Sequence, residues 1–207
     1  MKEKETPSIA WYEAHAAQVV EQYERLSFAD IHDWLIHRLP TDPGALVLDV
    51  GAGSGRDAAW FAERGYEVVA VEPSEAMRDA AHRRHSHPRI SWLDDRVPDL
   101  ISVHRMGTAF DVIHVSAVWM HVPPSQRARC FRKLITLLKP GGLLAVTLRI
   151  GEPDDERGIY PVSVEELHRL AREHGAYVEF SDTSPDLLGR PDVSWAKLAI
   201  RLPDDGR

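Results

Sequence analysis

The chain has 207 residues, 43% of them hydrophobic and 28% charged, and a formal net charge of −7. This length suits one domain with a sizeable core, and an acidic surface repels phosphate backbones, which argues against an extended nucleic-acid interface. The one cysteine, Cys130, excludes an internal disulfide, and its position in an amphipathic helical pattern predicts a buried thiol. Because no apolar stretch resembles a signal peptide or a membrane span, we expect a cytoplasmic protein that makes no membrane contact.

The N-terminal part of the chain is predicted to be helical. Apolar residues recur at helical spacing between residues 8 and 39, and residues 27–30 (Ser-Phe-Ala-Asp) have the form of a capping box that starts a second helix. Pro40 ends that helix. We therefore expect residues 1–40 to form a helical lid or flank, and residues 41–207 to form the main domain.

Short apolar runs then alternate with helical patterns. The runs predict strands over residues 45–50, 67–71, 89–93, 110–115 and 143–149, and the patterns between them predict helices over residues 56–64, 74–85 and 124–138. The strands are apolar throughout, which is typical of a parallel sheet covered on both faces. A polar loop, a helix capped by Ser163, and strands over residues 177–181 and 194–202 are expected to follow. The order of elements predicts a doubly wound α/β sheet.

A glycine-rich turn, Gly51-Ala52-Gly53-Ser54-Gly55, follows the first predicted strand. Glycines let the backbone approach a ligand closely, and the helix that follows offers free N–H groups to an anion, although a tight structural turn would also explain them. Glu72 ends the second strand, 21 residues after Gly51, where a carboxylate can accept hydrogen bonds from both hydroxyls of a ribose. The turn and the acid together favour a nucleoside ligand.

The spacing of the glycines distinguishes a dinucleotide from other ligands that contain a nucleoside. A dinucleotide fingerprint would place its third glycine at position 56, where Arg56 stands, and the glycine is at Gly55 instead. The chain here resembles the class I S-adenosylmethionine-dependent methyltransferase family, through four segments in the family's order: residues 47–55, 69–74, 110–113 and 137–142. The resemblance implies a Rossmann-like, mostly parallel seven-stranded sheet whose last strand is antiparallel.

The resemblance also implies a cofactor and the residues around it. S-adenosylmethionine would be bound, S-adenosylhomocysteine would be the product, and no metal would be needed. The turn and its neighbours would contact the cofactor through Asp49, Gly51, Ala52, Gly53, Gly55 and Arg56. Glu72 would hold the ribose, and the adenine would lie near Pro73, Ser74, Met77 and one of the two acids Asp94 and Asp95, of which Asp95 is favoured. Ser116 and Ala117 would lie beside the sulfonium.

Other residues are candidates for the lid, the substrate pocket and the transfer itself. Tyr12 and Tyr23 are placed to reach the cofactor carboxylate, or else simply pack in the lid. His121 follows the fourth strand, and its ordinary pKa suits a general base, although a bond from its ring to a loop carbonyl would also explain it. The substrate candidates near the same edge are Trp119, Arg149 and Tyr160, for which packing or ion pairing is an equal alternative.

The sequence leaves three functions to compare. The first is methyl transfer to the oxygen, nitrogen or sulfur of a small molecule. The second is a non-catalytic module that binds S-adenosylmethionine in regulation or assembly. The third, a nicotinamide oxidoreductase, is disfavoured by Arg56. The acceptor cannot be read from the sequence, because substrate choice lies in loops without a code, and the oligomeric state is expected to be a monomer or a homodimer.

Overall fold

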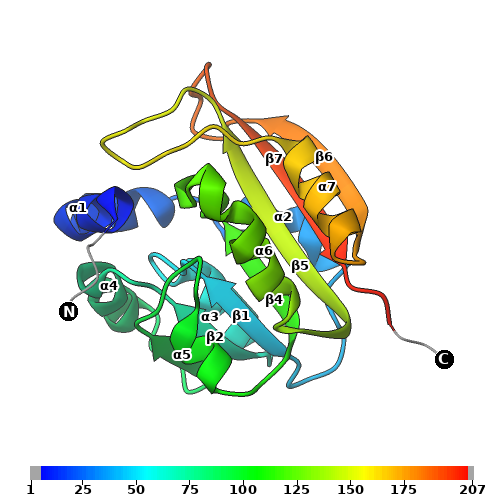
Figure 1. Ribbon diagram of the computed structural model, residues 1–207. Helices are drawn as coiled ribbons and strands as arrows, with labels where there is room; N and C mark the ends of the chain where they lie inside the picture. Colours follow the sequence, from blue (N-terminus) through cyan, green and yellow to red (C-terminus); the bar gives the residue numbers. More distant parts are fainter. Residues whose placement is uncertain (1–5, 205–207) are drawn as a thin grey trace.

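A computed structural model describes residues 6–204, and in it helices cover both faces of a seven-stranded sheet (Figure 1). The strands are β1 (Leu46–Val50), β2 (Glu67–Val71), β3 (Ile90–Leu93), β4 (Phe110–Ser116), β5 (Leu138–Ile150), β6 (Tyr177–Pro185) and β7 (Ser194–Arg201). Their order is β3-β2-β1-β4-β5-β7-β6. Strands β1 to β5 pair in parallel, and β7 pairs antiparallel with β5 and β6. The predicted fold class is therefore confirmed.

Except for α5, which the sequence did not predict, the helices begin within a few residues of where local sequence signals predict them. They are α1 (Pro7–Tyr23), α2 (Phe28–Ile36), α3 (Arg56–Glu63), α4 (Glu75–Arg84), α5 (Ile101–Arg105), α6 (Arg127–Ile135) and α7 (Val164–Glu173). The capping box before α2 is present, because the Ser27 hydroxyl accepts from the Asp30 N–H and the Asp30 carboxylate accepts from the Ser27 N–H. Ser163 caps α7 in the same manner, by accepting from the Glu166 N–H.

The fifth strand begins earlier than predicted. We expected a helix to Leu138 and a strand from Leu143, but α6 ends at Ile135 and β5 starts at Leu138. Gly141, with φ of +73°, lies in an irregular stretch of β5 where the pairing with β4 shifts register. A left-handed glycine allows a bulge inside a strand, so Gly141 lies within the irregular part of β5 and not in a turn that precedes the strand.

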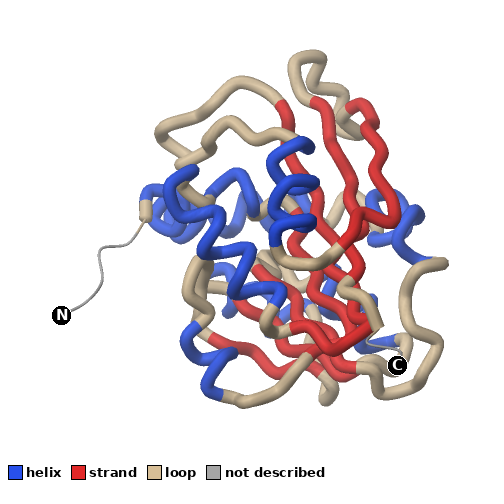
Figure 2. Tube along the Cα trace, turned by 45° about the vertical axis from the view of Figure 1, so that its right-hand side comes forward, coloured by secondary structure: helices blue, strands red, loops and turns tan. Residues whose placement is uncertain are grey.

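Alternate residues of the strands pack into two cores, one on each face of the sheet. Figure 2 shows helices, in blue, on both sides of the strands, in red. On one face, Val47 and Val68 pack with Phe28 of α2 and Phe61 of α3. The opposite face holds Leu48, Val69 and the buried residues of α6 and α7. Helix α2 is thus part of a core, whereas α1 lies on α4 outside the sheet.

Two further sequence expectations concern single features. Cys130 is buried in the core, and burial raises its pKa to about 12, which leaves an inert thiol. In the described range 6–204, none of the helices is long and apolar enough to cross a membrane.

Candidate functional site

The carboxyl ends of the parallel strands open onto a cleft that has two connected halves. One half has a volume of about 230 Å³ and the other about 150 Å³. Both are lined by the same central residues: Tyr12, Tyr23, Gly51, Gly53, Ser116, Ala117 and His121. Helix α1 covers this edge of the sheet beside α4 (Figure 1). The site lies where ligands bind in open α/β sheets.

The glycine turn is folded tightly against the end of β2. Gly51 has φ of +69°, and a Cβ there would come within 2.4 Å of the Val118 side chain. The N–H groups of Gly51 and Ala52 donate to the Val71 carbonyl, and that of Gly53 donates to Oε2 of Glu72 at 3.0 Å. Only glycine tolerates both the left-handed backbone and this contact, so the turn brings its backbone directly to the cleft.

Glu72 lies in the smaller half of the cleft with Pro73 and Met77. Its two carboxylate oxygens accept one N–H each, from Gly53 at 3.0 Å and from Ser74 at 2.9 Å. Burial raises its pKa to about 7, in spite of these bonds. A carboxylate oxygen can accept a second hydrogen bond, so Glu72 retains capacity for the two hydroxyls of a ribose.

Asp49 lies in the larger half of the cleft, at the end of β1. It is buried, and its Oδ2 has no hydrogen-bond partner within residues 6–204. Burial raises its pKa to about 7, and the charge of Asp57 adds to this effect. A buried oxygen without a partner is costly unless a ligand supplies a donor or a cation. S-adenosylmethionine carries both an ammonium and a sulfonium, so this residue fits the predicted cofactor.

A buried polar cluster lies beneath the larger half. Asp57 Oδ2 is 3.2 Å from Nε2 of His32 in α2 and 3.2 Å from Nε2 of His114 in β4, and Asp57 Oδ1 accepts from Arg56 Nε at 2.7 Å. Burial lowers the pKa of His32 to about 4, so its ring is neutral. Although burial raises the pKa of Asp57, the charge of Arg56 and the hydrogen bonds with His114 and His32 bring it well below its usual range.

The spacing of the three side chains in this cluster would also suit a metal ion. Two observations favour a hydrogen-bonded junction instead. The Nδ1 atoms of His32 and His114 find no partner in the part of the chain described, whereas histidine ligands normally donate through the second nitrogen. The guanidinium of Arg56 also places a positive charge on the same carboxylate. We infer that the cluster joins α2, α3 and β4; no sequence spacing signals it.

His121 lines both halves of the cleft. Its Nδ1 lies 3.0 Å from the Gly158 carbonyl, which can only accept, so Nδ1 carries the proton and Nε2 carries a lone pair. Nε2 is 3.4 Å from the Tyr12 hydroxyl, which in turn is 3.2 Å from that of Tyr23. Burial lowers the pKa of His121, and the nearby charge of Arg157 acts in the same direction. The ring is therefore a neutral base that faces the cleft.

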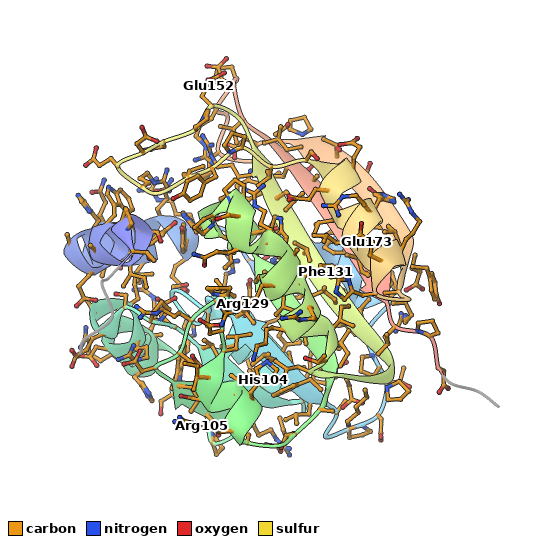
Figure 3. All side chains as sticks on the ribbon, viewed as in Figure 1. His104, Arg105, Arg129, Phe131, Glu152 and Glu173 are labelled. Atoms are coloured by element: carbon orange, nitrogen blue, oxygen red, sulfur yellow. The ribbon has the colours of Figure 1, made fainter. Side chains whose placement is uncertain are left out.

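The outer wall of the larger half comes from the last three strands and their loops. Thr147 and Arg149 of β5 pair with Lys197 and Trp195 of β7, so these four side chains share one face of the sheet. The loop after β5 adds Arg157 to the wall, and Glu152, which is labelled in Figure 3, lies near the start of this loop. Of the residues in this wall, only Arg149 was predicted from the sequence. The others come together through the pairing of β5 with β7 and through a loop that carries no motif, so no sequence pattern indicates them.

Asp95 lies in the smaller half of the cleft, where an adenine is expected. Its carboxylate accepts backbone N–H groups from Arg96, Ile101, Ser102 and Val103, and it thereby caps α5. Asp94 is outside the lining: its side chain is 72% exposed and pairs with Arg78. Of the two acids, the structure brings only Asp95 to the cleft.

Two residues near the turn serve packing and capping rather than the lining. A Cβ on Gly55 would meet Ala81 and Trp92 at 3.1 Å, so this glycine allows α3 to approach α4. The Ser74 hydroxyl accepts from the Met77 N–H and donates to Glu13, which caps α4.

Two of the substrate candidates also lie outside the lining. Trp119 is buried in the core against Phe131, with its indole N–H 3.5 Å from Glu166. Trp119 thus packs in the core, which is the alternative expected for it, and it lines neither half of the cleft. Tyr160 is half-buried, and its N–H donates to the Met120 carbonyl, which fastens the loop after β5.

Comparison with known proteins gives a consistent result. Residues 47–142 match a family model described as a methyltransferase domain. A protein-L-isoaspartate O-methyltransferase of Methylorubrum populi is 36% identical over 140 residues, which cover 65% of this chain and 66% of that protein. A trans-aconitate 2-methyltransferase of Methylobacterium radiotolerans is 31% identical over 67% of this chain and 46% of its own length. The chain thus spans about half to two thirds of these relatives.

A solved structure extends the likeness of fold to nearly the whole chain. The crystal structure of the [4+2]-cyclase SpnF superposes with a TM-score of 0.75 at 17% identity, over 96% of this chain and 97% of that one.

Proposed function

This chain belongs to the class I S-adenosylmethionine-dependent methyltransferase family, and on that premise we propose that it transfers a methyl group from S-adenosylmethionine to a small-molecule acceptor. One observation carries the proposal: the tight glycine turn at Gly51 lies against Glu72 and Asp49, two buried carboxylates with unused acceptor capacity. Binding of S-adenosylmethionine or S-adenosylhomocysteine is typical of this family.

The chain's own residues would hold and orient the reactants. Glu72 would accept the ribose hydroxyls, Met77 would contact the adenine, and Asp49 would face the positive charge of the cofactor. The cofactor, when bound, supplies an activated methyl group that an acceptor takes by in-line displacement. Helix α1 and the loop after β5 both contribute residues to the cleft. Side chains that hold the two reactants in a fixed orientation supply much of the rate of a displacement.

His121 is the proposed general base for an acceptor that must lose a proton. Its lone pair on Nε2 faces the cleft, and its Nδ1–H is fixed by the Gly158 carbonyl. An acceptor hydroxyl in the cleft would donate to Nε2 and transfer its proton there as the new bond forms. A carboxylate acceptor would not need this step.

The names of the relatives suggest the first acceptors to test. One relative is named for methyl transfer to oxygen in a protein, and the other for trans-aconitate. We propose a small molecule, since the cleft is covered by α1 and the net charge of −7 disfavours nucleic acid. Cytoplasmic location and a monomeric or dimeric state remain predictions, the second of which light scattering would test.

A second candidate function is cofactor binding without methyl transfer. It is favoured by the high similarity of fold to a protein named as a cyclase. The two candidates differ in turnover, not in binding, so the experiment must measure both.

The test combines calorimetry with S-adenosylhomocysteine and transfer of a tritiated methyl group to trans-aconitate and to other small acids. Gly51→Ala should abolish both signals, because its Cβ would strike Val118. Gly44→Ala is the matched control: Gly44 also has a positive φ, but no atom lies within 4 Å of an added Cβ. Binding without transfer to any acceptor would favour the second candidate. Absence of binding by the unmodified protein would refute both.

A further inference from the structure

Positive charge is in excess in the larger half of the cleft. Its lining contains five cationic side chains, Arg56, Arg149, Arg157, Arg190 and Lys197, and three carboxylates, Asp49, Asp57 and Asp186. An enclosed surface with unbalanced charge of one sign attracts a ligand of the other sign. Which cations are available depends on the pairs that the carboxylates already form.

Two of the carboxylates are already used by two of the cations. Asp57 pairs with Arg56, as described above. Asp186 accepts from Arg190 through Nε at 3.0 Å and Nη2 at 2.6 Å, and from the Trp195 indole at 2.8 Å. These contacts hold the pKa of Asp186 far below its usual range, with the bonds from Arg190 as the main cause. Asp186 therefore has no capacity left for the other cations of the wall.

The remaining cations of the outer wall form no ion pair within residues 6–204. Arg149 donates from Nη1 to the Glu152 carbonyl at 3.1 Å, and the guanidinium of Arg157 lies 4.7 Å from the centre of the Trp11 ring. The Nε atoms of both arginines are buried without a hydrogen-bond partner in this same range. A buried guanidinium N–H without an acceptor is costly, so both side chains have an Nε–H that is available to an oxygen atom of a ligand.

The arginines also act on one another. Burial lowers the pKa of Arg149, and the positive charges of Arg190 and Arg157 lower it further. Burial lowers the pKa of His121, and the charges of Arg157 and Arg149 lower it further. Side chains from β5 and from the loop after it therefore converge on one volume beside the proposed base.

We propose that Arg149 and Arg157 bind a carboxylate of the methyl acceptor, so that the substrate is a small organic acid. The planar guanidinium matches a carboxylate with two parallel N–H donors, and the unused Nε of each arginine can supply one of them. Lys197, on the neighbouring strand, adds charge to the same wall. The inference rests on the proposed function for the position of the cofactor, which places the ribose at Glu72 and the positive charge of the cofactor at Asp49; neither residue belongs to this wall.

Citrate serves as the probe, with triethyl citrate as its neutral counterpart and glycerol 3-phosphate as a different oxyanion. Each is titrated by calorimetry into protein saturated with S-adenosylhomocysteine. We expect citrate to bind and triethyl citrate not to bind. Arg149→Gln and Arg157→Gln should each weaken citrate binding by about tenfold or more, since a charge-assisted hydrogen bond is lost. Arg149→Lys keeps the positive charge but loses the two parallel N–H donors of the guanidinium. Its affinity for citrate should lie between those of the unmodified protein and of Arg149→Gln.

Controls separate this inference from the proposed function. Arg169→Gln removes an exposed arginine of α7 that pairs with Glu173, and it should leave citrate affinity unchanged. All variants should bind S-adenosylhomocysteine as the unmodified protein does. Loss of that binding in Arg149→Gln would assign the arginines to the cofactor and overturn the inference. The inference would also be overturned if citrate did not bind, if triethyl citrate bound equally well, or if only glycerol 3-phosphate bound. If S-adenosylhomocysteine did not bind to the unmodified protein, the proposed function would be refuted instead.

Discussion

At Glu72, burial brings the pKa of a carboxyl group to about 7, and the same holds at Asp49. A protein normally avoids such groups, because a buried carboxyl must either lose its charge or find partners. Here both lie in the cleft, and Asp49 retains an oxygen without a partner in the described chain. Perturbed acids in a cleft mark functional sites, and in this case the cost is expected to be relieved by the bound cofactor.

The affinity for S-adenosylhomocysteine should therefore depend on pH near neutrality. Two ribose hydroxyls donate best to an ionised Glu72, so binding favours the charged form and lowers its pKa. As the pH falls from 8 to 6 the free carboxyl takes up a proton that binding must remove, and the dissociation constant should rise by about tenfold. Calorimetry at both pH values measures this effect. Glu72→Gln should bind weakly with a smaller pH dependence, and equal affinity of the unmodified protein at pH 6 and 8 would contradict the prediction.

His121 gives a second prediction at the scale of one residue. Its lowered pKa, due first to burial and then to Arg157, keeps it neutral and basic at pH 7, so activity should decline only below about pH 6.5. With a hydroxyl acceptor, His121→Asn should reduce kcat by about 10²-fold to 10⁴-fold and leave KM for the cofactor nearly unchanged. His168→Asn, a change on α7 outside the cleft lining, is the control. An unchanged kcat in His121→Asn would show that orientation alone suffices.

Single elements were the part of the fold that the sequence predicted best. Continuous apolar runs, a capping box at Ser27 and the cap at Ser163 are local signals, so strand and helix positions followed from them. The bulge at Gly141 was missed because it depends on pairing with β4, and α5 was missed because a helix of five residues leaves no periodic pattern. The wall around Arg149 depends on the pairing of β5 with β7, two strands that are far apart in the sequence. Residue spacing could therefore not predict it.

The junction of α2, α3 and β4 is likewise a tertiary feature, and it leads to a prediction about stability. Asp57→Asn would leave Arg56 buried without its charge partner and remove the acceptor shared by His32 and His114, so unfolding should become easier by about 3–5 kcal/mol. Because the pKa of Asp57 is lowered in the folded state, its contribution is present above pH 4 and is lost as the pH falls through the lowered value.

Urea titration at pH 7 measures this loss of stability. Asp79→Asn, at an exposed position of α4, should change the free energy of unfolding by less than about 0.5 kcal/mol. Addition of a chelator should leave the melting temperature of the unmodified protein unchanged, since hydrogen bonds already account for the cluster. A clear drop with chelator would instead assign a metal to these three residues.

For the whole molecule, the two cores and the cover over the cleft differ in stability. Each face of the sheet has a large buried core, whereas α1 rests on α4 through a small cluster of Ala16, Val19, Val20 and Met77. Local opening is easiest where few apolar contacts are buried. Yet α1 supplies Tyr12 and Tyr23 to both halves of the cleft, so a helix that is expected to open easily also lines the proposed ligand site.

Hydrogen exchange followed by mass spectrometry should show this difference. Without ligand, amides of residues 7–23 should exchange faster than those of β1 and β4, which lie at the centre of the sheet. Saturation with S-adenosylhomocysteine should slow exchange in residues 7–23 and in the loop at residues 151–163, because the His121 contact to Gly158 joins that loop to the cleft. Helix α7, none of whose residues lines the cleft, serves as the internal control and should change little. Uniform slowing across the whole chain would show instead that the protein opens as one unit and that α1 is not a separate cover, since a ligand then stabilises every amide equally.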